Sequence, residues 1–169
     1  MMFSTSKKST PSLASLHSSF LTTQKIAHRG LHGSFTIQHK TVFLPENSLA
    51  AFQNAVQYHF AIELDIHFLS DHTVVVLHDN NTRRLTQIPK KVKTSTLLEL
   101  TTLRLQPSKT TESHLIPTLN QVLELVAGRT PLLIELKSET KVNYRQFCQE
   151  TLNLLKIYQE TYPQGTHPR

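Results

Sequence analysis

The 169-residue chain contains no tryptophan, one cysteine and only four glycines. The single cysteine, Cys148, excludes an internal disulfide, and we expect it to be a small buried residue next to Phe147. No apolar run approaches the ~20 residues that a membrane-spanning helix needs, so no transmembrane segment is expected. Hydrophobic residues make up 38% and charged residues 18% of the chain, proportions typical of a folded domain rather than a disordered segment.

Acidic residues are fewer than basic residues: the chain has 12 Asp and Glu against 18 Lys and Arg, which gives a formal net charge of +6. A basic balance can indicate a nucleic acid or another anionic partner. The densest basic group has no interleaved aromatic residue and no helical pattern, and we interpret it as a solvated loop: Arg83, Arg84, Lys90, Lys91 and Lys93. The alternative for this group is a site that attracts anionic substrates. No nucleic-acid partner is therefore expected.

The first 24 residues are rich in serine and threonine and contain no arginine. They also lack the apolar core of about 7–15 residues found in a secretory signal. We expect residues 1–24 to form a flexible tail, residues 25–162 the folded domain and residues 163–169 a second tail. The lone cysteine and the missing secretory signal favour a cytoplasmic location.

Four short apolar runs are rich in β-branched residues and have the length of strands: residues 25–28, 61–68, 73–78 and 131–137. Helical patterns separate most of them, and this alternation predicts an α/β fold with a largely parallel sheet. Only residues 69–72 join the second and third runs, which leaves a hairpin or a short crossover open. Residues 79–116 are expected to be a loop-like insertion with a short helical stretch near residues 96–103.

Three helices are predicted from capping residues and periodic apolar positions. Asn47 is expected to cap a helix whose apolar stripe begins at Leu49. Thr118 and Gln121 have the spacing of a capping box, which predicts a second helix that ends near Gly128. A longer helix is expected to follow residue 141 and to end before residue 163.

Charged residues interrupt two of the predicted strands. Glu63, Asp65 and His67 share one strand face because side chains alternate along a strand, and Glu135 and Lys137 share a face of another. Carboxylates that face a sheet interior are costly unless a cation neutralises them. Glu63, Asp65 and Glu135 therefore indicate a site for a divalent metal, Mg²⁺ or Ca²⁺, since these cations prefer oxygen ligands.

Other polar residues lie where two further strands end. His28 and His78 are suited to proton transfer near neutral pH, whereas Arg29 and Lys137 are suited to binding a phosphate. Taken singly, each feature has a structural alternative, such as a surface strand, a helix start or a simple ion pair. Their joint occurrence at strand ends indicates phosphoryl chemistry.

An ordered set of motifs extends this hypothesis: Ile26–Gly30, Leu44–Ser48, Ile62–Asp65, Val75–Asp79, Ile116–Leu119 and Ile134–Lys137. In this order they resemble the glycerophosphodiester phosphodiesterase family. The resemblance implies a TIM (β/α)₈-type barrel with its site at the carboxyl ends of the strands. It also implies an enzyme that hydrolyses a small-molecule glycerophosphodiester, in phospholipid-derived metabolism, to glycerol 3-phosphate and an alcohol.

The resemblance further implies a role for each matched residue. Glu63, Asp65 and Glu135 correspond to metal ligands. His28 and His78 correspond to the general acid and base, and Arg29 and Lys137 to phosphate contacts. Glu46 and Asn47 correspond to residues that support the metal site from behind. Five other histidines match no catalytic position and are expected to be structural or at the surface: His32, His39, His59, His67 and His72. Among them, His72 stands where the family usually has a glycine in the turn before the third strand.

A complete (β/α)₈ barrel usually needs ~250 residues, so we expect only the N-terminal half, about four strands, to be present. Three alternatives follow. The chain is a truncated enzyme, or two half-barrels self-associate through the open edge, or it is an inactive remnant or binding module. A related phospholipase-type phosphodiesterase is the rival enzyme class.

Overall fold

The structure is a computed structural model that describes residues 24–37, 39–106 and 114–163. Its central sheet is built around the long strand β4 (Ala61–Phe68). The strands β1 (Ile26–Ala27) and β6 (Leu132–Leu136) flank β4 and run parallel to it. The expected tails, residues 1–24 and 163–169, lie almost entirely outside the described residues, so those two expectations stay untested.

The joint between β4 and the next strand, β5 (Val74–Val76), is a hairpin rather than a crossover. β5 runs antiparallel to the last residues of β4, with Phe68 opposite Val74. His72 in this turn has a φ of 68°, the left-handed conformation for which glycine has no steric cost. Its ring stacks on Phe68 with the centroids 5.6 Å apart. The departure from glycine is therefore accommodated by a packed aromatic contact.

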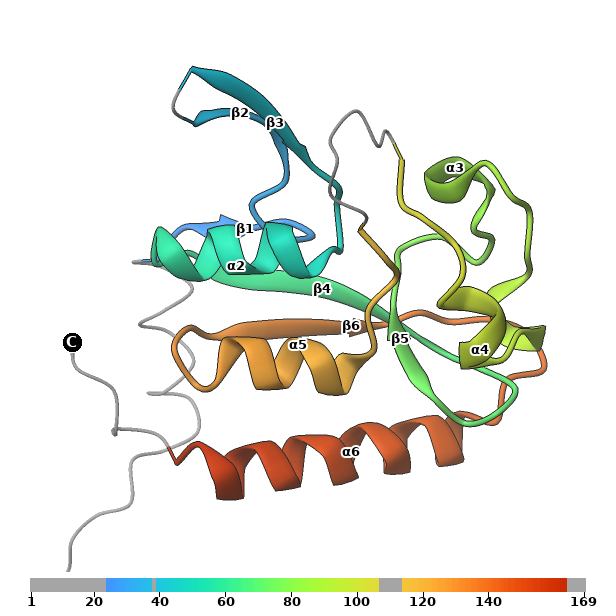
Figure 1. Ribbon diagram of the computed structural model, residues 1–169. Helices are drawn as coiled ribbons and strands as arrows, with labels where there is room; N and C mark the ends of the chain where they lie inside the picture. The colour runs from blue at the N-terminus through green and yellow to red at the C-terminus, as the bar shows by residue number, and fades with distance from the viewer. Residues whose placement is uncertain (1–23, 38, 107–113, 164–169) are drawn as a thin grey trace, which may run out of the picture.

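Three helices pack with the sheet around the larger core: α2 (Leu49–Gln57), α5 (Leu119–Val126) and α6 (Tyr144–Thr161) (Figure 1). Phe52, Val122 and Phe147 are their fully buried contributions. These apolar positions drive the helices onto the sheet because each removes a large hydrophobic surface from water. Cys148, expected to be buried beside Phe147, is instead exposed.

The cap of α2 corrects one prediction. Ser48, not Asn47, is the N-cap, and its side chain accepts a hydrogen bond from the backbone N–H of Ala51. Asn47 has a φ of 52° and its side chain turns to the sheet instead. The capping box of Thr118 and Gln121 is present as expected.

The described parts of the segment between β5 and α5 confirm the short helical stretch expected near residues 96–103 and contain further helical turns. They contain α3 (Arg83–Thr86), the 3₁₀ helix η1 (Val92–Thr94) and α4 (Leu97–Leu100). These pieces pack on a second, smaller core that includes Leu77, Leu85, Leu100 and Leu105. This core matters for the site because it fixes the positions of the residues that follow β5.

The sequence did not predict the antiparallel hairpin of β2 (Gly33–Ile37) and β3 (Lys40–Leu44). It lies between the motif at residues 28–30 and the motif at residues 45–47, and it projects away from the sheet (Figure 1). Within the described parts of the chain, no helix is both long and apolar enough to cross a membrane.

Candidate active site

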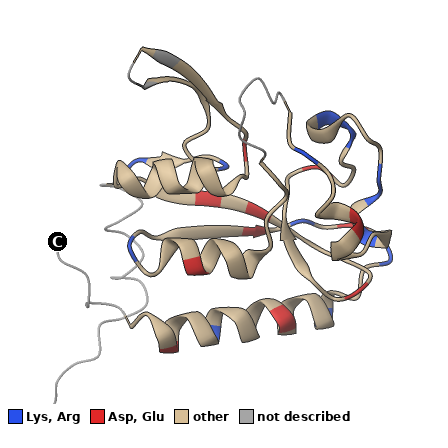
Figure 2. Ribbon diagram, viewed as in Figure 1, with Lys and Arg blue, Asp and Glu red and all other residues tan. Residues whose placement is uncertain are grey.

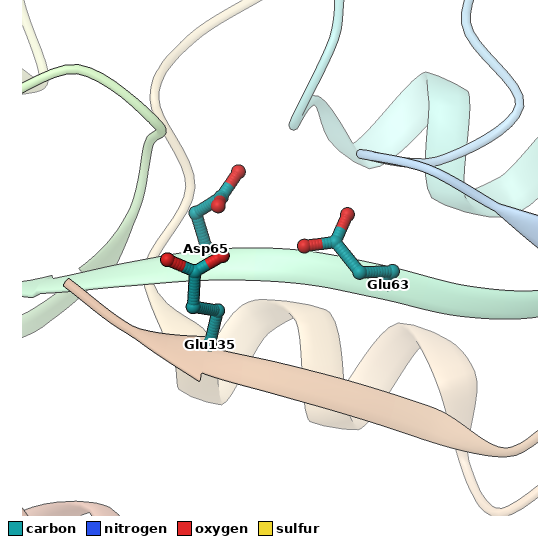
Figure 3. A group of neighbouring side chains, drawn as sticks. All are labelled: Glu63, Asp65 and Glu135. Carbon is teal, nitrogen blue, oxygen red and sulfur yellow. The ribbon is translucent and has the colours of Figure 1, made fainter.

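The carboxylates of Glu63, Asp65 and Glu135 form one cluster, with one oxygen from each lying within 4.8 Å of the others (Figure 3). The sheet produces this geometry directly. Glu63 and Asp65 alternate onto one face of β4, and the parallel register places Glu135 of β6 opposite Asp65. The three predicted metal residues therefore converge, and three carboxylate oxygens are a donor set suited to Mg²⁺ or Ca²⁺.

Asp65 lies at the centre of the cluster and is 1% exposed. Its carboxylate is 2.8 Å from Lys137 Nζ and 3.5 Å from Arg29 Nε. Asn47 Nδ2 donates a third contact at 2.9 Å. A buried carboxylate requires such partners, so the expected phosphate contacts, Arg29 and Lys137, also neutralise the expected metal ligand.

The other two carboxylates are held differently. Glu63 accepts a hydrogen bond from the backbone N–H of Arg29 at 2.9 Å, and His28 Nε2 lies 4.0 Å from the same oxygen. Glu135 is 56% exposed and contacts Lys137 Nζ at 2.7 Å. Partial burial alone would lower the pKa of Lys137, but its hydrogen bonds to Asp65 and Glu135 outweigh that effect and raise it. Lys137 therefore stays cationic.

Two residues of the site have left-handed backbone conformations. Arg29 has a φ of 55° and Asn47 a φ of 52°, and the Asn47 N–H donates to the Arg29 carbonyl at 2.9 Å. Such conformations cost about 1–3 kcal/mol each away from glycine and cluster at functional sites. At the neighbouring Gly30 (φ 81°), an added Cβ would meet Ala51 and Phe52 atoms at 3.0 Å. Close packing on α2 thus holds this turn in place.

Arg84 connects two motifs that are far apart in the sequence. Its Nη1 and Nη2 donate to Glu46 at 2.9 and 2.7 Å, and its Nε donates to Asp79 at 2.6 Å. Glu46 in turn accepts from Arg29 at 3.1 Å, and Asp79 lies 2.9 Å from Nδ1 of His78. Arg84 is exposed but is not simply a solvated loop residue, because its side chain joins Asp79, the partner of His78, to Glu46, the partner of Arg29.

This bridge lowers the pKa of both carboxylates. The guanidinium of Arg84, with help from Arg29, holds the pKa of Glu46 below its ordinary value despite partial burial. Burial alone would raise the pKa of Asp79, but hydrogen bonds from Arg84 and His78 outweigh it and lower it. Both side chains are therefore ionised at neutral pH.

We expect Arg84→Gln to lower the free energy of unfolding at pH 7 by about 1 kcal/mol, because the pairs are partly exposed and screened by solvent. A lowered folded-state pKa stabilises the fold above the ordinary value, 4.5 for Glu46 and 3.8 for Asp79. The stabilisation is lost as the pH falls through the lowered values. In urea unfolding experiments, the difference in unfolding free energy between Arg84→Gln and the unchanged protein should thus be constant above pH 5 and shrink towards pH 3.

Arg145, an exposed residue of α6, provides the matched control for that experiment. Arg145→Gln should change the unfolding free energy little at either pH. A difference between Arg84→Gln and the unchanged protein that grew on acidification would contradict the ion-pair explanation.

An open cleft of about 710 Å³ adjoins the cluster on the side of His78 and Lys137. Apart from His67 of β4, its remaining lining comes from the residues after β5 and β6: Asp79, Asn80, Asn81, Arg83, Arg84, Pro89, Ser138 and Glu139. Basic residues gather on the segment around α3, whereas acidic residues mark β4 and β6 (Figure 2). The cleft is therefore polar and has room for a small molecule beside the carboxylates.

His67 and Glu139 are lining residues to which the sequence assigned no role in the site. His67 is 3% exposed, and its Nδ1 lies 3.0 Å from Glu139 while its Nε2 lies 3.2 Å from the His78 carbonyl. The expectation that His67 is structural is consistent with these contacts. Its position on the same face of β4 as Asp65 was the signal that could have placed it beside the site.

Comparisons with known proteins agree with this geometry. Residues 28–166 match the model of the glycerophosphoryl diester phosphodiesterase family. YhdW of Bacillus subtilis strain 168 is 38% identical over 115 residues, which are 66% of this chain and 44% of YhdW. A glycerophosphodiester phosphodiesterase of Caldanaerobacter subterraneus is 36% identical over 137 residues, 79% of this chain and 52% of that protein.

Among solved structures, a phosphodiesterase of Oleispira antarctica in complex with the product sn-glycerol-3-phosphate has a TM-score of 0.65. It is 24% identical and is matched over 84% of this chain and 54% of its own, so the likeness shows the fold: the described strands correspond to part of a barrel. The chain spans about half the length of the curated relatives it matches.

Proposed function

The chain belongs to the glycerophosphoryl diester phosphodiesterase family, and we propose that its site hydrolyses glycerophosphodiesters to glycerol 3-phosphate and an alcohol. The observation that carries the proposal is the convergence of Glu63, Asp65 and Glu135 within 4.8 Å. His28 and Lys137 lie in contact with this cluster. Carboxylates, histidines and fixed cations in one place are the groups that phosphoryl transfer requires.

A divalent cation, Mg²⁺ or Ca²⁺, would be held by Glu63, Asp65 and Glu135. The donor set fits, and Asn47 Oδ1 is an additional buried oxygen that has no hydrogen-bond partner among the described residues. When bound, the cation would neutralise phosphate charge and polarise the P–O bonds. Asn47 and Glu46 would hold the ligands and Arg29 in position through hydrogen bonds, without binding the cation themselves.

The two histidines would move the protons. Ionised Asp79 can only accept a hydrogen bond, so the Nδ1 of His78 carries the proton between them and Nε2 is left for exchange. One histidine would deprotonate the nucleophile, which is water or the substrate's own glycerol hydroxyl, and the other would protonate the leaving alcohol. Arg29 and Lys137 would hold the phosphate oxygens.

Metal removal provides the direct test. With Mg²⁺ or Ca²⁺ supplied, we expect release of glycerol 3-phosphate from glycerophosphocholine, measured by an enzyme-coupled assay. Excess EDTA should abolish the release, and restoring either cation in excess of EDTA should return it. Hydrolysis that survives EDTA would contradict the role of the carboxylate cluster.

A second candidate is a binding module without turnover, because the carboxylate cluster and the lysine beside it would bind a cation and a phosphate without any proton transfer. It predicts cation-dependent binding of glycerophosphodiesters, measured by calorimetry, without release of glycerol 3-phosphate. A related phospholipase-type activity would instead release product from a sphingolipid or phosphoinositide.

Three further expectations remain proposals. A folded domain over residues 25–162 and a cytoplasmic location follow from the sequence alone. Self-association through the open edge is a third. Among the described strands β6 pairs only with β4, and Leu133 and Leu136 on it are 47% and 36% exposed. Size-exclusion chromatography with light scattering would detect a dimer.

A further inference from the structure

The open cleft beside His78 is lined mostly by residues that follow β5 and β6. Of the residues that would touch the phosphate or the cation, only His78 and Lys137 line it, and the cluster carboxylates do not. A diester whose phosphate lies between the cluster and His78 would therefore place one of its two alcohols in this cleft. This inference rests on the proposed function and names the part of the substrate that the cleft receives.

Most charges in the cleft lining are already paired. His67 contacts Glu139, His78 contacts Asp79, and Lys137 contacts Asp65. Paired charges present little net field to a ligand, because each is neutralised by a neighbour a few ångströms away. The selectivity of the cleft must come from groups that remain unpaired.

Arg83 is the lining cation whose side chain has no ion-pair partner among the described residues. The contrast with its neighbour is direct, since Arg84 is held by two carboxylates whereas Arg83 is exposed at the start of α3. Asn81 accepts from the Arg83 backbone N–H through Oδ1, which leaves its amide N–H groups free to donate. Asn80 adds a second exposed amide to the same lining.

We propose that this cleft is the subsite for the leaving alcohol and that Arg83 makes it selective for a headgroup that carries an additional phosphate. A guanidinium is suited to a phosphate because its planar fork donates two parallel hydrogen bonds. A quaternary ammonium group is recognised by aromatic rings. The cleft has no aromatic side chain among its described lining residues other than two imidazoles, both in polar contacts. A choline headgroup would meet Arg83 as a like charge.

The test compares three diesters of graded headgroup charge: glycerophosphoinositol 4-phosphate, glycerophosphoinositol and glycerophosphocholine. Binding is measured by calorimetry with Mg²⁺ in a His28→Ala background, because His28 is outside the cleft lining and its loss is expected to stop turnover. We expect the phosphorylated inositol diester to bind about fivefold more tightly than the unphosphorylated one, the size of a partly exposed ion pair. The choline diester should bind most weakly.

Arg83→Gln should bring the two inositol diesters to equal affinity, whereas Arg145→Gln, on α6 and outside the cleft, should leave the order unchanged. Equal binding of all three diesters, tightest binding of the choline diester, a preference that survives Arg83→Gln, or no binding of any diester would each overturn the subsite. The proposed function is judged separately by hydrolysis with His28 intact. If the three diesters bind in the expected order but are not hydrolysed, the proposed enzymatic function is contradicted and the subsite is supported. If they are hydrolysed but do not bind in that order, the subsite is contradicted and the enzymatic function is supported.

Discussion

Asp65→Asn is expected to lower the hydrolysis rate by about 10³-fold, since losing one ligand charge removes several kcal/mol of transition-state stabilisation and each 1.36 kcal/mol is a factor of ten. Asp65 is the most buried of the three carboxylates and the one that contacts Arg29, Asn47 and Lys137 together. Its replacement removes one of the three negative charges that would bind the cation. It also removes the negative charge that neutralises the two basic residues beside it. Calorimetric titration with Mg²⁺ or Ca²⁺ should show at least a tenfold weaker cation affinity.

The asparagine variant keeps the shape of the side chain, so its oxygen can still accept from Asn47. It should nevertheless unfold more easily, by about 1–3 kcal/mol, because a charged hydrogen-bonded group has been replaced within a buried network. Glu160→Gln, at an exposed acidic position of α6, is the control and should change neither cation affinity nor rate. Unaltered cation affinity in Asp65→Asn would remove this residue from the proposed metal site.

His78→Ala is the second variant with a large expected effect, a fall in rate of about 10²–10⁴-fold, the range for loss of a general acid or base. His78 is about one-third exposed and fixed through Asp79 to the Arg84 bridge. Its removal should leave cation affinity nearly unchanged, because the ring makes no contact with the three cluster carboxylates in the structure. Rate and cation titrations measured on the same preparation separate a proton-transfer role from a metal role.

His59→Ala provides the matched control, because His59 is an exposed histidine after α2. It should retain the full rate. A His78→Ala protein with an undiminished rate and an unchanged melting temperature would show that another group transfers the proton.

Much of the fold was predictable because its signals are local. The apolar runs became β1, β4, β5 and β6, since a buried strand must present continuous or alternating apolar residues. The capping box at Thr118 and Gln121 involves residues three apart and needed no tertiary information. In contrast, Asn47 was predicted to cap α2, but its side chain contacts Asp65 and the neighbouring Ser48 is the cap.

The β2–β3 hairpin was missed because its two strands are short, five residues each, and lie between two motifs of the site. The direction of β5 was left open because the sequence of a four-residue connection does not distinguish a hairpin from a short crossover. The positive φ of His72 and its stacking on Phe68 are seen only in the folded turn.

The sequence by itself determined the sheet strands and the residues that alternate onto one face of β4 and β6. Strand periodicity fixes the side of Glu63 and Asp65, and a parallel register is enough to bring Glu135 beside them. Only the tertiary structure decided the partners of the loop arginines. The path of the chain after β5 carries Arg84 to Glu46 and Asp79 and leaves Arg83 in the cleft without an ion-pair partner among the described residues. No periodicity encodes that difference, because ion pairing between distant loops depends on the packing of the small core beneath them.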